Sequence, residues 1–265
     1  MTVTASRKSL IKFNNVCKTY NLMSGECIDA LKCFDGDIYE QEFVSLIGPS
    51  GCGKSTLLKI VAGLLPMSDG NIEINGKPVK GPQKGTVGVV FQSPVLLPWK
   101  TILDNVLLPV QVLNLDIGDK KEYFRQRALE LLKLVGLKGF EKAYPRELSG
   151  GMQQRVSIAR SLIHDPLILL MDEPFGALDA MTRERLNMEL LRIWESNKKT
   201  VMFITHHIPE AVFLSDRIFV MGVNPGRIVE TIEVTLPRPR DFSVMDTQEF
   251  IKISSHVRSL LREKE

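Results

Sequence analysis

The residues of this chain that are best suited to chemistry lie at 48–55, where the sequence follows the spacing G-x-x-x-x-G-K-[ST]. Glycines in such a loop let backbone N–H groups turn toward phosphate oxygens, because no Cβ stands in the way. Lys54 can reach the terminal phosphates as a point charge, and the Ser55 hydroxyl can bind Mg²⁺. The spacing therefore predicts a site for a nucleoside triphosphate with Mg²⁺.

The sequence on either side of this loop supports the prediction. Residues 44–47 are mostly apolar and predict a buried parallel strand, and Leu57, Ile60, Val61 and Leu64 recur at helical spacing after the loop. The alternative is an ordinary glycine-rich turn beside a solvated lysine. The order of strand, loop and helix favours the phosphate site.

Two acidic residues, Asp172 and Glu173, follow a continuous apolar run at 167–171. A run of this length predicts a strand that is buried on both faces. Since open α/β sheets bind ligands at the carboxyl ends of their strands, Asp172 can bind Mg²⁺ and Glu173 can orient a water molecule. The alternative role, capping of the next helix, is weakened by the intervening Pro174.

A serine and two glycines, Ser149, Gly150 and Gly151, stand at the predicted start of another helix. Backbone amides at a helix start can bind an anion. Serine and glycine are also favoured at this position simply as capping residues. From these residues alone, both interpretations stay open.

Three aromatic side chains are further candidates. His206 and His207 follow a predicted strand at 201–205, where a histidine is more often structural than catalytic. We expect these adjacent side chains to diverge, which disfavours a two-histidine metal site. Tyr20 precedes the glycine-rich loop and can either stack on an adenine ring or serve as an ordinary strand aromatic.

Hydrophobic periodicity and turn residues predict the elements that position these side chains. Residues 1–9 are polar and are expected to be loose. Strands are expected at 10–20, 28–34, 71–74, 86–91, 201–205, 217–222 and 227–234, with turns at 35–37, 75–76 and 224–226. Helices are expected at 119–135, 150–163, about 186–194, 208–214 and 249–261.

An apolar loop at 93–100 contains two prolines, which exclude a regular element there. Its side chains Leu96, Leu97 and Trp99 have two possible roles. They contact a partner protein, or they pack back on their own domain, which is the commoner outcome for apolar residues.

The amino-acid composition limits the classes of protein to which this chain can belong. The chain has 265 residues, of which 44% are hydrophobic and 25% charged, and its net charge of +3 comes from 34 basic and 31 acidic residues. Such a balance is typical of a globular protein and gives no support for nucleic acid as a partner. No apolar run approaches the roughly 18 to 20 residues of a membrane span, and no signal peptide is recognisable, so we expect a cytoplasmic protein. The four cysteines lack C-x-x-C pairing and are expected to be reduced thiols.

The order of these motifs resembles that of the ATP-binding cassette ATPases over nearly the whole chain, from about residue 10 to about residue 241. Residues 48–56 are similar to the Walker A motif of that family, and Gln92 is similar to its Q-loop. Residues 148–154 are similar to its signature motif, and residues 167–172 to its Walker B motif.

Four further features strengthen the resemblance. Glu173 matches the catalytic acid of the family, residues 177–179 match its D-loop, and His206 matches its switch histidine. Tyr20 matches the aromatic residue that stacks on adenine. Many cassettes carry Asp where this chain has His207, which leaves the role of His207 open.

The resemblance implies an α/β fold: a P-loop NTPase nucleotide-binding domain of the ABC type, with an antiparallel β subdomain and a helical subdomain. We expect a loose N-terminus at 1–9 and the ATPase domain at 10–241, with its helical subdomain at about 93–165. Residues 242–265 are expected to form a C-terminal helical extension.

The resemblance also implies ATP and Mg²⁺ as ligands and ATP hydrolysis as the activity. The implied ATP-binding residues are Tyr20, Gly48, Pro49, Ser50, Gly51, Cys52, Gly53, Lys54, Ser55 and Thr56. The implied Mg²⁺-binding residues are Ser55, Gln92 and Asp172, and the implied catalytic residues are Glu173 and His206. Ser149, Gly150, Gly151 and Gln153 are implied to close the ATP site of a second copy of the chain.

The partners implied by the resemblance are a second copy of the chain, two transmembrane permease chains and, indirectly, an extracytoplasmic solute-binding protein. Nucleic acid is not among them. The chain would lie peripherally at the cytoplasmic face of the cell membrane, with the loop at 93–99 lining the groove that receives a permease helix.

Within the family, the segments at 91–94, 97–99, 205–211 and 236–240 resemble the nitrate, sulfonate and taurine importer branch. Substrates in that branch also include bicarbonate and pyrimidine precursors. We therefore expect a subunit that hydrolyses ATP to energise solute import. The alternative is a soluble ABC ATPase that does not act in transport.

Overall fold

The computed structural model describes residues 7–21, 23, 25–118, 120–176, 178–223 and 225–262. Parts of five expected features lie outside these ranges: the loose N-terminus up to residue 6, Asp119 at the start of the helix expected at 119–135, Ala177 of the D-loop, Asn224 of a turn, and residues 263–265 of the C-terminal extension. The chain forms two compact units, one made of 1–83 with 198–265 and the other of 84–197.

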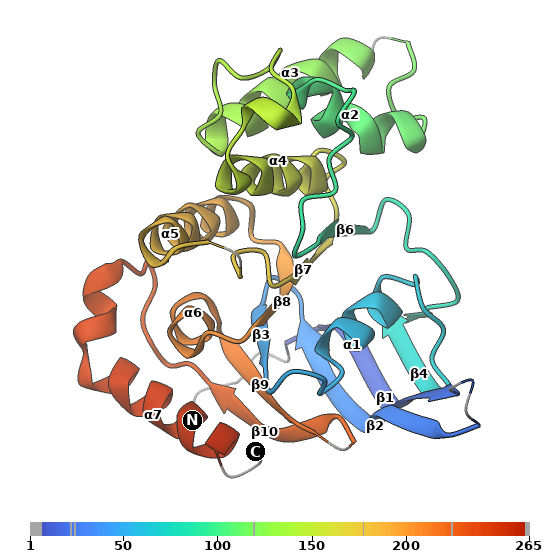
Figure 1. Cartoon of the computed structure of the whole chain (residues 1–265), viewed down its shortest axis with the longest axis vertical. Helices are drawn as coiled ribbons and strands as arrows, with labels where there is room; N and C mark the ends of the chain where they lie inside the picture. Colours follow the sequence, from blue (N-terminus) through green and yellow to red (C-terminus); the bar gives the residue numbers. More distant parts are fainter. Residues whose placement is uncertain are drawn as a thin grey trace. The chain divides into compact units, whose positions relative to one another are not determined.

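The first unit contains an antiparallel sheet with the strand order β2-β1-β4-β5, of which Figure 1 labels β2, β1 and β4. These strands are β1 (Ser9–Asn21), β2 (Cys27–Tyr39), β4 (Asp69–Ile74) and β5 (Lys77–Pro78). The hairpin between β4 and β5 turns at Asn75 and Gly76, whose φ angles are 50° and 71°. Two successive positive φ angles are what a two-residue hairpin loop requires, so the predicted turn at 75–76 is confirmed.

The turn that we predicted at 35–37 is wrong, because β2 continues through these residues. Gly36 pairs with Phe13, and Asp37 pairs with Lys12 on β1. The Asp37 carboxylate accepts a hydrogen bond from Ser9 Oγ at 2.7 Å, so an acidic side chain that suggested a turn instead ties two strands together. The chain turns later, at Gln41, where φ is 61°.

The first unit also contains the parallel strand β3 (Phe43–Ile47), which lies between β8 (Thr200–Thr205) and β9 (Arg217–Gly222). β10 (Arg227–Glu233) pairs antiparallel with β9. Every residue of β3 and β8 is buried, as expected for strands that are covered on both faces.

Three α-helices accompany these strands: α1 (Lys54–Val61), α6 (Ile208–Leu214) and α7 (Gln248–Arg262). Figure 1 shows α6 and α7 on one side of the parallel strands and α1 on the other. A short 3₁₀ helix, η2 (Phe242–Asp246), precedes α7. Leu64, which we expected on the buried face of α1, lies beyond the end of this helix and is 54% exposed.

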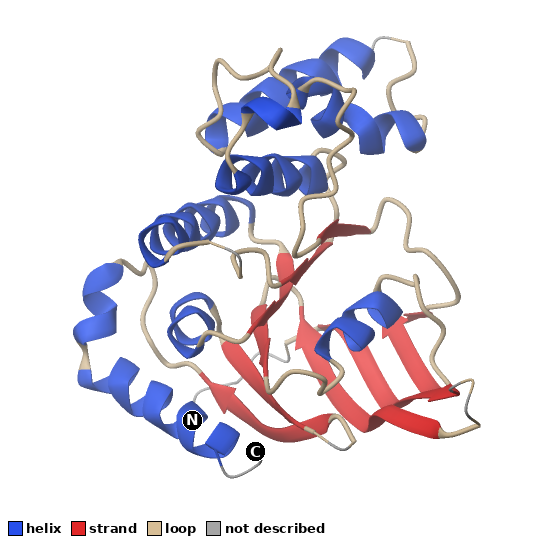
Figure 2. Cartoon of the chain, in the orientation of Figure 1, coloured by secondary structure: helices blue, strands red, loops and turns tan. Residues whose placement is uncertain are grey.

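The second unit combines a parallel pair of strands, β6 (Val87–Val90) and β7 (Ile168–Asp172), with mostly helical sequence (Figure 2). Its helices are α2 (Ile102–Val112), α3 (Lys120–Leu134), η1 (Pro145–Glu147), α4 (Gly150–Leu162) and α5 (Ala180–Asn197). The predicted apolar face of α5, which includes Leu186 and Leu190, is buried.

Helix α2 is absent from the prediction. Pro109 lies inside it, and a proline normally argues against a helix interior. Thr101 caps its N-terminus by accepting a hydrogen bond from the Asp104 amide, and Val106 and Val110 are fully buried. Since α2 packs against α3 and α4, tertiary burial outweighs the local cost of the proline.

Candidate functional site: a phosphate loop and two strand edges

The glycine-rich loop connects the end of β3 to the start of α1 and needs its glycines for close approach. A Cβ on Gly48 would lie 2.6 Å from the carbonyl oxygen of Met221. Gly53 has a φ of 89°, and a Cβ there would lie 2.6 Å from the carbonyl oxygen of Ala30. Gly51, at a φ of 81°, faces open space. The loop is therefore packed against its surroundings at both ends and is open at Gly51.

Lys54 lies at the first position of α1 and is 7% exposed. Its Nζ donates hydrogen bonds to the carbonyl oxygens of Gly48 at 2.8 Å and Pro49 at 2.9 Å. No side chain caps the N-terminus of α1, because its N-cap residue is Gly53. The loop thus combines a buried ammonium group with the positive end of a helix, which is the arrangement that favours a phosphate.

Tyr20 lies near the end of β1, next to the first turn of α1. Its hydroxyl is 3.4 Å from Thr56 Oγ1, and its ring is 38% exposed. The Nζ of Lys18 is 5.2 Å from the ring centroid. A half-exposed ring beside the phosphate loop is able to stack on a nucleotide base.

His206 follows the end of β8, at the same edge of the sheet where the phosphate loop follows β3. In the parallel pair of β3 and β8, Ile47 lies opposite Thr205, so Gly48 and His206 are the next residues of neighbouring strands. The expectation that His206 and His207 diverge is wrong, because their ring centroids are 4.0 Å apart. Within the first unit, the structure therefore brings together Tyr20, residues 48–56 and His206.

The second unit has an equivalent edge. Val90 at the end of β6 lies opposite Met171 on β7, so Gln92 and Glu173 follow at the carboxyl end of the same strand pair. Gln154 Nε2 donates to the carbonyl oxygen of Phe91 at 3.0 Å, which ties this edge to α4. The φ of Glu173 is 42°, a left-handed conformation that a non-glycine residue adopts at a cost and that is commonest at functional sites.

Ser149 caps α4, as its side chain accepts a hydrogen bond from the Met152 amide at 3.3 Å. Ser149, Gly150 and Gly151 also line a pocket of about 340 Å³, together with Asp179. The start of α4 is therefore both capped by Ser149 and part of the wall of a pocket.

Several lining residues of this pocket were not singled out in the sequence. They include Arg155 on α4 and Arg185 on α5, which add positive charge beside the exposed helix start. No local pattern marks them, because α4 and α5 meet only in the fold.

Gln153 does not line this pocket. Its Nε2 donates hydrogen bonds to the carbonyl oxygens of Pro145 and Leu148, and so holds the loop before α4.

Among the residues that the structure describes, no group of three or more His, Cys, Asp or Glu side chains could hold a metal ion. Mg²⁺ does not require such a group, because it usually binds through one or two protein ligands, water and substrate phosphates. The Ser55 hydroxyl in the first unit and the Asp172 carboxylate in the second are oxygen ligands of the kind that it prefers. Each of these two side chains, taken by itself, is therefore chemically suited to bind Mg²⁺.

The fold and these residues define a class of protein: a P-loop nucleoside triphosphatase with an additional antiparallel sheet and a helical segment. Comparison with known proteins identifies the family. Residues 31–176 match the family model described as ABC transporter. The chain belongs to the ABC transporter family, as an ATP-binding cassette ATPase.

Two relatives are similar over most of their length. The aliphatic sulfonates import ATP-binding protein SsuB of Bacillus cereus is 45% identical, over 91% of this chain and 93% of that protein. The taurine import ATP-binding protein TauB of Rhizobium johnstonii is 44% identical, over 97% of this chain and 98% of that protein.

Solved structures support the same family. A dimeric structure of a bacterial ABC transporter cassette has a TM-score of 0.76 and 38% identity, covering 86% of this chain and all of that one. A dimeric post-hydrolysis state of the same cassette, bound to ADP and Pi, also has a TM-score of 0.76, with 37% identity and the same coverage. In the part of the chain that the structure describes, none of the helices is long and apolar enough to cross a membrane.

Proposed function

We propose that this chain is the ATP-hydrolysing subunit that energises a solute importer of the cell membrane. The observation that carries the proposal is the phosphate loop, in which Gly48 and Gly53 permit close backbone packing around the buried Lys54. The relatives named for aliphatic sulfonate and taurine import support an organic sulfonate as the solute. Nitrate, bicarbonate and pyrimidine precursors belong to the same proposed range.

The proposed site divides the work among a few residues. The amides of residues 48–56 and the Lys54 ammonium bind the phosphates, and Tyr20 stacks on the adenine. Glu173 orients and polarises the attacking water, and His206 contacts the γ-phosphate. Ser55, Gln92 and Asp172 hold Mg²⁺, which neutralises phosphate charge. This division follows the general logic of phosphoryl transfer, in which positioning and charge stabilisation supply most of the acceleration.

We further propose that two copies of the chain form an ATP sandwich. In this dimer, Ser149, Gly150, Gly151 and Gln153 of one copy close the ATP site of the other. Arg185, which lines the pocket beside Ser149, supports this role, because a guanidinium group favours phosphate. Gln153 then acts by holding the loop before α4, as its two hydrogen bonds to backbone carbonyls suggest.

The proposed dimer docks at the cytoplasmic face of the membrane, under two permease chains that receive solute from an extracytoplasmic binding protein. The loop at 93–99 is the proposed contact. Asn105 is fully buried and holds this loop, since it accepts from the Leu97 amide at 2.7 Å and donates to the carbonyl oxygens of Leu97, Lys100 and Thr101. Leu96 and Leu97 are half-buried, whereas Trp99 is 71% exposed and available to a partner.

The proposed domain division assigns 10–241 to the cassette, 93–165 to its helical subdomain and 242–265 to a C-terminal extension. Helix α7 of this extension packs against α6 and β9 through Phe250, Ile253 and Val257.

The dimer is tested with Glu173→Gln, which keeps the shape of the side chain but removes its charge. With ATP and Mg²⁺, this variant should elute from a sizing column as a dimer, because closure is retained while hydrolysis is slowed. Glu184→Gln, at an exposed position on α5, is the matched control and should hydrolyse ATP as the wild type does. A Glu173→Gln variant that stays monomeric with ATP would contradict the role of Glu173.

The transport role is tested by affinity purification of the tagged chain from detergent-solubilised membranes of its own host. A multispanning permease recovered in equal amount would support the importer proposal. Recovery of soluble proteins alone would favour a soluble ABC ATPase outside transport.

A further inference from the structure

A buried chain of hydrogen bonds fixes the backbone on both sides of His206. Thr205, the last residue of β8, is 1% exposed, and its hydroxyl donates to Glu210 Oε2. The same hydroxyl accepts a hydrogen bond from the His207 amide at 3.0 Å. The residue before His206 and the residue after it are therefore both tied to one carboxylate.

Glu210 is itself fixed, because it belongs to the first turn of a buried helix. It is 4% exposed, and the four residues that follow it to the end of α6 are fully buried. At the other end of α6, the Arg240 guanidinium donates to the carbonyl oxygens of Phe213 at 2.8 Å and Ser215 at 2.9 Å. Since α6 is held at both ends, Glu210 cannot shift without moving the helix.

The position of this hydrogen-bond chain connects it to the phosphate loop. Thr205 lies opposite Ile47 in the parallel pair of β3 and β8. These hydrogen bonds therefore lie at the edge of the sheet where the loop at 48–53 begins. His206 is exposed at this edge, and its ring centroid lies 4.0 Å from that of His207. Because the Thr205 hydroxyl holds the His207 amide, the same hydrogen bond fixes the backbone that carries both rings.

We propose that Glu210 and Thr205 are positioning residues that aim the His206 imidazole at the nucleotide phosphates. This proposal rests on the proposed function, which assigns His206 to the γ-phosphate. Glu210 acts through Thr205, and Thr205 acts through the two peptide groups that flank His206. Neither residue needs to touch the nucleotide.

A double-mutant cycle tests the proposal, and its main variant, Thr205→Val, nearly preserves the volume of the side chain. Thr205→Val removes the hydroxyl, Thr205→Ser keeps it, and His206→Ala removes the positioned group. Thr205→Val should lower kcat roughly tenfold to a hundredfold, as expected for misplacement of a catalytic group, and leave KM for ATP nearly unchanged. Thr205→Ser should retain kcat. In the His206→Ala background, Thr205→Val should cause no further loss, because the group that it positions is already gone.

A second measurement needs no activity and no nucleotide. The His207 amide should be protected from hydrogen exchange in the wild type and lose this protection in Thr205→Val and Glu210→Gln, while the amide of Phe203 within β8 stays protected. Protection of Phe203 also shows that the variants are folded.

Three outcomes are distinguishable. If Thr205→Val lowers kcat by the same factor with and without His206, the positioning role is wrong and the proposed function stands. Unchanged exchange of the His207 amide in both variants also contradicts the positioning role. If His206→Ala alone hydrolyses ATP at the wild-type rate, the catalytic assignment of His206 fails first, and the positioning role fails with it.

Discussion

Lys54 donates a hydrogen bond from its Nζ to the carbonyl oxygen of Gly48 at 2.8 Å, so the phosphate loop is closed on its own lysine. A second bond, to the Pro49 carbonyl oxygen, completes the arrangement. Charged phosphate oxygens are stronger acceptors than neutral carbonyl oxygens, and they can therefore displace both bonds. We therefore expect nucleotide binding to exchange these two internal hydrogen bonds for charge-assisted ones.

Lys54→Met should abolish most of the ATPase activity, because it keeps an unbranched side chain but removes the charge. Loss of one preorganised electrostatic donor costs about a hundredfold to a thousandfold in kcat. Phosphate release measures this loss, and titration with a fluorescent nucleotide reports the weaker binding. Lys59→Met, an exposed position in the last turn of α1, is the matched control and should be active. Equal activity of the two variants would contradict the role of Lys54.

Tyr20→Ala should weaken ATP binding, whereas Tyr20→Phe should bind ATP almost as the wild type does. The stacking surface is the ring, and the hydroxyl makes only a long contact of 3.4 Å with Thr56. Base stacking on an aromatic ring is worth about 1 to 3 kcal/mol by alanine substitution. Calorimetric titration with ATP measures the difference. Comparable weakening in both variants would shift the role from the ring to the hydroxyl.

Gly48→Ala should destabilise the fold, because its Cβ would lie 2.6 Å from the Met221 carbonyl oxygen and 2.8 Å from Cys52 Sγ. Overpacking of this kind typically costs about 1 to 3 kcal/mol. Gly81→Ala is the control, since a Cβ there meets nothing within 4 Å. It should leave stability unchanged or raise it by up to about 1 kcal/mol, through the unfolded chain. Urea unfolding compares the two, and equal midpoints would show that the loop can relax around the added methyl group.

The elements that position the phosphate loop could be predicted because their signals are local. The strand at 217–222 and the helix at 208–214 have the bounds that periodicity and turn residues predicted. Parallel strands end at one edge of a sheet, so two buried runs that precede Gly48 and His206 are compatible with a shared edge. That the two strands are adjacent is shown only by the structure.

The rest depends on contacts that no local pattern encodes. Arg240 lies in a Pro/Arg segment whose prolines exclude a helix interior, and no local pattern marks it as buried. It is nevertheless only 5% exposed, because it donates to carbonyl oxygens at the end of a helix more than 20 residues earlier. The hydrogen bond from Thr205 to Glu210 requires a strand end and a helix start to fold onto each other. The predicted turn at 35–37 failed for the same reason, since pairing with β1 overrode the turn propensity of Asp-Gly-Asp.

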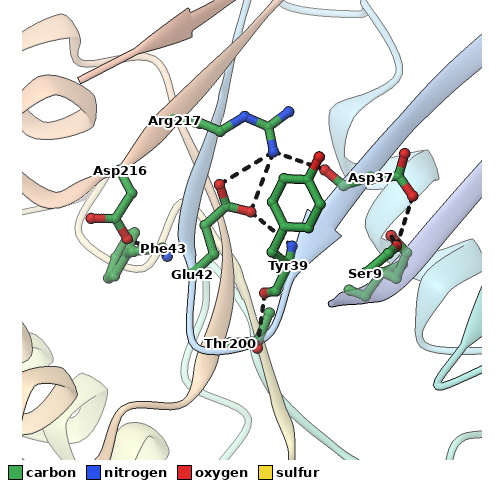
Figure 3. A network of polar contacts seen from close by, with 9 residues as sticks. Ser9, Asp37, Tyr39, Glu42, Phe43, Thr200, Asp216 and Arg217 are labelled. Atoms are coloured by element: carbon green, nitrogen blue, oxygen red, sulfur yellow. Dashed lines mark hydrogen bonds and ion pairs between the residues drawn. The ribbon is translucent and has the colours of Figure 1, made fainter. Parts of the chain in front are cut away.

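Glu42 should make the stability of the first unit depend on pH. Its carboxylate accepts hydrogen bonds from the Tyr39 amide at 2.8 Å and from Arg217 at 3.2 Å, beside the bond from Arg217 to the Asp37 carbonyl oxygen (Figure 3). Burial raises the pKa of Glu42 above its ordinary value of 4.5, by more than these donors lower it. Between the unfolded and folded pKa values, the folded state therefore binds more protons than the unfolded state. The contribution of Glu42 to the free energy of unfolding is then largest below its unfolded pKa and falls as pH rises through the folded pKa.

Glu42→Gln isolates this effect, because glutamine does not titrate. The free energy of unfolding of the wild type, minus that of Glu42→Gln, should decrease as pH rises from about 4.5 through the folded pKa and then stay level. Urea unfolding at a series of pH values measures it, with Glu40→Gln, a more exposed carboxylate paired with Lys8, as the control. A difference that grows with pH would mean that attraction to Arg217 outweighs the cost of burial.

Trp99→Ala should weaken binding of the permease without lowering the basal ATPase activity. Because the side chain is 71% exposed while Asn105 holds the loop from within, truncation should change stability by no more than about 0.5 kcal/mol and leave basal ATPase activity intact. A tryptophan at the centre of an interface commonly supplies 2 kcal/mol or more, so about that much permease affinity should be lost. Copurification of the permease and stimulation of ATPase activity by the assembled transporter measure the loss. Ile251→Ala, which removes an exposed apolar side chain from α7, controls for loss of surface hydrophobicity. If Trp99→Ala retains the permease, or if Ile251→Ala loses it equally, the loop at 93–99 is not the docking contact.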